Sequence, residues 1–88
     1  MDNILLLKKR QKYPNNIQNW MEINLSKSDY ERLMREIPAK MNISSRTWYY
    51  YRIGTTEIGI TKLQMVFEML KPLGCTDILH LIQDLSGN

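Results

Sequence analysis

The sequence predicts an all-α fold: one small domain of five or six helices. Its 88 residues suit a single domain, and 43% hydrophobic with 24% charged residues is ordinary for a globular protein. Apolar residues recur every three or four positions in 28–41 and 60–70, which is the period of an amphipathic helix. Between them, 44–54 carries a helix start signal and a helix stop signal. These signals divide the chain into an N-terminal helical extension (1–27), a core (28–74) and a C-terminal helix (75–88).

The N-terminal extension begins with a short apolar run, 4–7, which is followed by the basic cluster Lys8, Lys9 and Arg10. This cluster suits either an arm along DNA phosphates or the solvent side of a helix whose residues 5–7 pack on the domain. A membrane span needs about 20 apolar residues, and a signal peptide would place its charge before a longer apolar core. We therefore expect a cytoplasmic protein that does not enter a membrane.

Two helical patterns follow a turn signal at 13–16. The first is short and has Ile17, Trp20 and Met21 at helical spacing. The second, 28–41, should begin with a capping box, in which the side chains of Ser28 and Glu31 each satisfy a free backbone N–H. Its apolar stripe consists of Tyr30, Leu33, Met34, Ile37 and Met41.

Pro38 interrupts the second pattern and leaves two alternatives. Proline lacks a backbone donor and disfavours α geometry at the preceding residue, Ile37. Either the helix kinks at Pro38, or a new helix starts there with Pro38 in its first turn.

Residues 42–54 predict a sharp turn and a further helix. Asn42 tolerates the left-handed conformation that such a turn needs, and Ser44 is a good N-cap. Gly54 suits the position after the helix, because it adopts positive φ without steric cost. At about 100° per residue, Trp48 and Tyr51 share one side of this helix, which should be buried. The other side carries Arg46, Tyr49, Tyr50 and Ile53.

The run from Ile43 to Gly54, which opens I-S-S-R-T-W, resembles the Cro/lambda-repressor-like (XRE) helix-turn-helix proteins of bacteria and phages. In that family a pattern of the type I-S-x-x-T-aromatic-or-Ile opens the recognition helix, a Gly closes it and a packing helix follows. The resemblance covers roughly residues 30–78. The chain departs from the family at Asn42, where the turn usually has Gly, and at Pro38, where a small Ala is usual. The resemblance implies a lambda-repressor-like domain that binds double-stranded DNA sequence-specifically as a small transcriptional regulator.

If the second helix of the pair enters the major groove, its outer side chains should contact bases. The Arg46 guanidinium can bind O6 and N7 of guanine, a contact worth about 1–3 kcal/mol in discrimination, and Tyr49 or Tyr50 can pack against a thymine methyl group. Exposed tyrosines also suit a protein interface, so an interaction module that does not bind DNA is the alternative. The base-contacting residues expected are Arg46, Tyr49 and Tyr50. The phosphate-contacting residues expected are Ser44, Ser45, Lys40 and Arg52.

Positive charge is concentrated in the part of the chain that holds the predicted helix pair. Residues 1–54 contain ten basic and five acidic residues, whereas 55–88 contain two basic and four acidic residues. The net charge is +5 for residues 1–54 and −2 for residues 55–88, which favours a polyanionic partner for the first part.

The last part of the chain predicts a packing helix and a terminal helix. Segment 60–70 has apolar residues at core spacing, and Pro72 and Gly74 end it. Thr76 is a candidate N-cap for a last helix, 76–85, whose apolar surface exceeds one stripe. This helix either forms a homodimer, which would place two recognition helices about one DNA turn apart, or docks on its own core. The residues at core spacing are Ile60, Leu63, Val66, Phe67 and Leu70.

Enzyme chemistry finds little support in the sequence. His80 has no partner at metal-ligand spacing, and Cys75 is a single thiol without a disulfide partner. The chain has no glycine-rich phosphate loop. We therefore expect no catalytic residues, no metal and no cofactor.

Overall fold

The computed structural model describes residues 12–83, and all regular structure in them is helical. The α-helices are α2 (Ile17–Asn24), α3 (Lys27–Met41), α4 (Ser45–Ile53) and α5 (Ile60–Leu70). Two short 3-10 helices follow, η1 (Lys71–Leu73) and η2 (Ile78–Leu81). The all-α class predicted from the sequence is confirmed. The apolar run 4–7 and its basic cluster lie outside the described residues.

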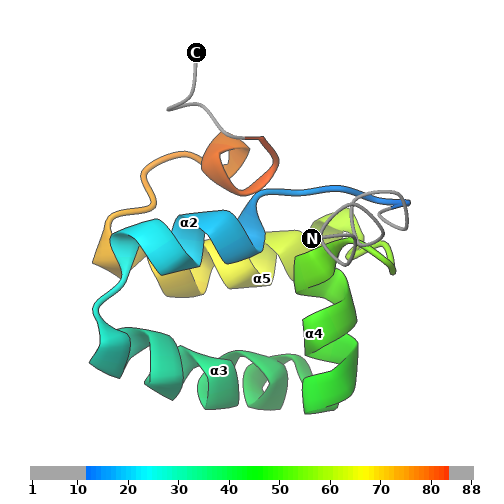
Figure 1. The fold of residues 1–88 in the computed structure, drawn as a ribbon, viewed down its shortest axis with the longest axis horizontal. Helices are drawn as coiled ribbons and strands as arrows, with labels where there is room; N and C mark the ends of the chain where they lie inside the picture. Colours follow the sequence, from blue (N-terminus) through cyan, green and yellow to red (C-terminus); the bar gives the residue numbers. More distant parts are fainter. Residues whose placement is uncertain (1–11, 84–88) are drawn as a thin grey trace, which may run out of the picture.

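The helices enclose one apolar core, to which each α-helix contributes one side. Figure 1 shows α4 leaving the end of α3 in a new direction, with η2 above α2. Trp48 of α4 is 1% exposed and is the largest of the fully buried side chains. Ile60 was expected in the core but is 64% exposed, because it occupies the first position of α5 at the edge of the domain. The buried residues are Ile17, Trp20, Met21, Leu33, Ile37, Met41, Trp48, Tyr51, Ile58, Leu63, Val66, Leu70, Cys75 and Leu81.

One prediction for α3 is corrected, and one alternative that the sequence left open is resolved. The helix begins after Ser26, not Ser28: the Ser26 hydroxyl accepts a hydrogen bond from the N–H of Asp29 at 3.1 Å. Ser26 has the extended backbone that an N-cap requires, whereas Ser28 already lies in the first turn. The helix is also continuous through Pro38, which is buried, so the segment is not split into two helices.

A short turn joins α3 to α4 as the sequence predicts. Asn42 is left-handed (φ 57°, ψ 46°), and the N–H of Ile43 donates to the carbonyl of Pro38 at 3.0 Å. The Ser44 hydroxyl accepts from the N–H of Thr47 at 3.0 Å, which caps α4. The left-handed Gly54 ends α4, and its N–H donates to the carbonyls of Tyr50 and Tyr51.

The segment 13–16 links the C-terminal end of α4 to η2. The Tyr13 N–H donates to the carbonyl of Gly54 at 2.8 Å, and the Asn15 side-chain amide donates to the carbonyl of Tyr51 at 2.8 Å. Asn16 donates to η2 with both its backbone and its side chain, to the carbonyls of Leu81 and His80. These four bonds join parts of the domain that are far apart in the sequence.

The predicted C-terminal helix is corrected within the described residues. Asp77, not Thr76, provides the cap: its carboxylate accepts from the N–H of Leu79 at 2.9 Å, and the turn that follows is a 3-10 helix of four residues. The N–H groups of His80 and Ile82 donate to carbonyls three residues back, those of Asp77 and Leu79, which is the 3-10 pattern. Leu81 is buried in the core, while Leu79 and Ile82 are exposed.

Gly54→Ala should destabilise the domain by about 2 kcal/mol or more. A Cβ at Gly54 would lie 2.9 Å from the carbonyl oxygen of Tyr13, on a backbone with φ of 81°. The matched control is Asn42→Ala, which has a left-handed backbone at an exposed position and should cost about 1 kcal/mol. Urea denaturation followed by circular dichroism compares the two. Equal losses would contradict the close contact with Tyr13.

Ser44→Ala should lower the free energy of unfolding by about 1 kcal/mol, because the N–H of Thr47 loses its acceptor. Ser45→Ala is the matched control, since Ser45 is exposed at the first helical position and provides no cap. Its effect should stay within about 0.5 kcal/mol. Thermal or urea denaturation of both variants tests the assignment, which fails if the two serines prove interchangeable.

Candidate nucleic-acid interface

The two sides of α4 are occupied as the sequence predicts. Trp48 and Tyr51 face the core, whereas Arg46 is exposed and Tyr49 and Tyr50 are 44% and 38% exposed. Ile53, which the spacing placed on the outer side, is only half-exposed. The helix therefore presents one cation and two phenol rings to the outside.

The exposed rings pack against one another and against a cation. The ring centroids of Tyr49 and Tyr50 lie 5.8 Å apart, with the planes tilted by 52°. The guanidinium carbon of Arg52 lies 5.6 Å from the Tyr49 centroid and 5.4 Å from the Trp48 centroid. Both distances are within the range of a cation–π contact. Arg52 therefore covers the boundary between the exposed and the buried side of α4.

Three of the predicted phosphate-contacting residues are exposed near the start of α4. Lys40 lies in the last turn of α3, and Ser44 and Ser45 open α4. The Ser44 hydroxyl is already engaged with the backbone N–H and the hydroxyl of Thr47. The first-turn N–H groups of a helix have no partners within the helix, and together with the helix dipole they attract an anion. This end of α4 is therefore suited to a phosphate.

The basic side chains of α3 fall into two groups. Arg32 pairs with Asp29 at 3.3 Å and with Glu36 at 2.8 Å, so its charge is locally balanced. Arg35, Lys40 and, in α4, Arg46 are exposed and form no salt bridge with a described carboxylate. Arg35 is thus an exposed cation that the predicted site omitted.

Arg52, the fourth predicted phosphate contact, is half-buried and makes contacts within the protein. Its guanidinium donates to the side-chain oxygen of Gln18 in α2. Gln18 in turn donates to the hydroxyl of Tyr30 at 2.6 Å and to the carboxylate of Glu22 at 2.7 Å. Burial lowers the pKa of Arg52, while the charge of Glu22 acts in the opposite direction. The phosphate role of Arg52 stays a prediction. No local signal in the sequence pointed to Gln18, which is 34 residues from Arg52.

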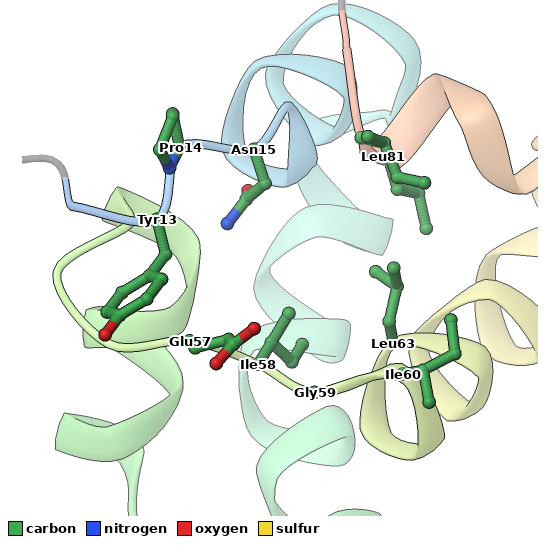
Figure 2. A pocket seen from close by; sticks show the side chains of 10 residues that line it. Tyr13, Pro14, Asn15, Glu57, Ile58, Gly59, Ile60, Leu63 and Leu81 are labelled. Atoms are coloured by element: carbon green, nitrogen blue, oxygen red, sulfur yellow. The ribbon is translucent and has the colours of Figure 1, made fainter.

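A separate apolar pocket of about 340 Å³ lies away from the outer side of α4. It opens between segment 13–15, loop 57–60 and η2, and Figure 2 shows Leu63 and Leu81 pointing toward one another across it. Tyr13, Ile60 and Ile82 at its edge are exposed. Among its described lining residues Glu57 alone carries a formal charge at neutral pH, so the pocket suits an apolar group. The lining residues are Tyr13, Pro14, Asn15, Glu57, Ile58, Gly59, Ile60, Leu63, Leu81 and Ile82.

The one cysteine and the one histidine of the chain both lie in the segment 75–80. The Cys75 thiol is buried and lies 3.7 Å from the carbonyl of Asp77, and His80 contacts Asn16 through its carbonyl alone. Within 12–83, no three His, Cys, Asp or Glu residues are grouped to hold a metal ion. In the same range, no helix is long and apolar enough to cross a membrane.

No protein-family model matches the chain, and neither a curated protein nor a solved structure matches it.

Cys75 should react with a thiol reagent roughly a hundredfold or more slowly in the native protein than in urea. Burial raises the pKa of its thiol, so little thiolate is present at pH 8, and the side chain is inaccessible. Ellman's reagent measures both rates, and the chain contains no other cysteine. Fast native labelling would show that the region around η2 opens readily.

Proposed function

We propose that the protein binds double-stranded DNA sequence-specifically, as a small transcriptional regulator. In this proposal α3, the turn 42–44 and α4 form a helix-turn-helix, and α4 enters the major groove. The observation that carries the proposal is the construction of α4: it is capped at both ends and held by Trp48, and it presents Arg46 and two tyrosines outward. The resemblance of 43–54 to the Cro/lambda-repressor-like proteins supports the same conclusion.

In this proposal, side chains on the outer side of α4 contact the bases directly. Arg46 lies in the first turn, where its guanidinium can reach the O6 and N7 atoms of a guanine. Tyr49 and Tyr50 lie one turn further along, where their rings suit thymine methyl groups and their hydroxyls suit phosphates. The site therefore combines one hydrogen-bonding contact with an apolar surface.

Side chains around the start of α4 would contact the DNA phosphates. Lys40, Ser44 and Ser45 lie there, together with free backbone N–H groups and the positive end of the helix dipole. The basic balance of residues 1–54 adds long-range attraction to DNA. The regulator would act without chemistry, by excluding or recruiting other proteins at a promoter.

A homodimer through the C-terminal residues is part of the proposal. Leu79 and Ile82 are exposed, and Ile82 also lines the apolar pocket; burial of both against a second copy would give a two-fold symmetric protein. Such a dimer would bind two half-sites about one turn of DNA apart.

The second candidate function is binding of a protein partner without DNA. The exposed Tyr49–Tyr50 pair favours it, because tyrosines are enriched at protein interfaces. DNA is the better-supported partner, because Arg46 lies on the same helix as the two tyrosines, and Arg46, Lys40 and Arg35 are exposed cations without carboxylate partners among the described residues.

Selection of duplexes from a random DNA pool tests the proposal, with wild type and Arg46→Ala compared at moderate salt. Wild type should enrich one motif, and Arg46→Ala should lose the preference at one base pair, by roughly tenfold, while the remaining positions persist. A two-fold symmetric motif would also support the proposed homodimer.

Glu57→Ala is the matched control, because Glu57 is exposed but lies in the loop before α5 and not on α4. Its selected motif should equal that of wild type. If wild type enriches no motif and its binding to bulk DNA does not depend on salt, the regulator proposal is wrong, and the tyrosine face belongs to a protein partner.

A further inference from the structure

The side chain of Arg52 is enclosed by groups of its own protein. Its guanidinium lies over the rings of Trp48 and Tyr49, and it donates to Gln18. Its Nε atom is buried and has no hydrogen-bond partner among the described residues. Arg52 therefore contacts the largest buried ring of the domain and an exposed ring of the proposed DNA-binding face at the same time.

The hydrogen bonds around Gln18 allow only one orientation of its amide. Arginine can only donate, so the oxygen of Gln18 must face Arg52. The amide nitrogen then faces the carboxylate of Glu22, which can only accept, and the hydroxyl of Tyr30. Gln18 thus joins α2, α3 and α4 with a fixed polarity, and its oxygen holds the Arg52 guanidinium by a hydrogen bond.

We propose that Arg52 and Gln18 are positioning residues that hold the Tyr49 ring in its base-contacting orientation, an inference that rests on the proposed DNA-binding function. An exposed tyrosine on a helix is otherwise free to change rotamer. Contact with a guanidinium that is itself fixed by Gln18 restricts the ring before DNA arrives. A contact that is organised in advance discriminates better between bases, because less order must be created on binding.

This assignment differs measurably from the phosphate contact predicted for Arg52. A residue that neutralises one phosphate contributes about 0.9 to the slope of log affinity against log salt concentration. A positioning residue leaves that slope unchanged and alters the preference at one base pair. Gln18 carries no charge, so its replacement separates the two roles cleanly.

The experiment uses the full chain and the motif that wild type selects. Affinities of wild type, Gln18→Ala, Arg52→Met and Arg52→Lys are measured for that duplex, for each single-base-pair change in it and for bulk DNA, across a salt series. Tyr49→Ala identifies the base pair that Tyr49 contacts. Gln18→Ala and Arg52→Met should each lose roughly tenfold of the preference at that base pair and keep the wild-type salt slope.

Two variants serve as controls. Lys40→Ala should lower the salt slope by about 0.9 and preserve every base preference. Arg52→Lys keeps the charge but lacks the planar guanidinium that stacks on a ring, so it should behave like Arg52→Met. Thermal denaturation verifies that each variant is folded at the assay temperature.

Each alternative outcome overturns the inference in a recognisable way. A lower salt slope in Arg52→Met with unchanged preferences would make Arg52 a phosphate contact. If Gln18→Ala and Arg52→Met lose affinity equally for all duplexes, both residues have a structural role only. If Tyr49→Ala loses no base preference, Tyr49 does not contact a base, and there is no contact for Arg52 and Gln18 to position. In these cases the proposed function stands. If wild type itself selects no motif, the proposed function and this inference fail together.

Discussion

The burial of the Trp48 indole is the constraint on which the outer face of α4 depends. Only Trp48 and Tyr51 of this helix are buried, so two aromatic side chains attach it to the core. Truncating such a side chain typically costs about 3–5 kcal/mol, out of a total stability of about 5–15 kcal/mol for a small domain. The indole nitrogen has no hydrogen-bond partner among the described residues, so packing and the overlying Arg52 fix the ring. The rotation of α4 about its axis, and with it the identity of the exposed residues, follows from the burial of Trp48 together with Tyr51.

Local sequence signals predicted the backbone correctly at residues whose chemistry favours one particular conformation. Asn42, Ser44 and Gly54 adopt the backbone conformations that their chemistry favours, and the 3.6-residue period correctly divided α4 into two faces. The start of α3 shows where such signals become ambiguous. Ser26 and Ser28 are each followed three residues later by an acid, and it is Ser26 that has the extended backbone of the N-cap.

Contacts between distant segments explain what the local signals left open, assigned wrongly or omitted. A continuous α3 through Pro38 is stabilised by the core in which Pro38 is buried, which overrides the local preference of proline. The C-terminal 3-10 turn is held by Asn16, which donates to the carbonyls of His80 and Leu81. Likewise, the spacing of residues along α4 cannot reveal that Arg52 meets Gln18. In each case the deciding partner lies on another element.

The hydrogen bonds from segment 13–16 bear on how the domain folds. They join this segment to residues 36 and 64 positions away, so the bonds that complete α4 form only after the chain has closed large loops. Closing such loops costs conformational entropy before any contact compensates for it, and slows folding compared with a bundle of purely local contacts. An excised α3–α4 peptide would leave the carbonyls of Tyr51 and Gly54 without these donors. The helix pair is thus a dependent part of one cooperative unit, whose folding requires both ends of the described chain.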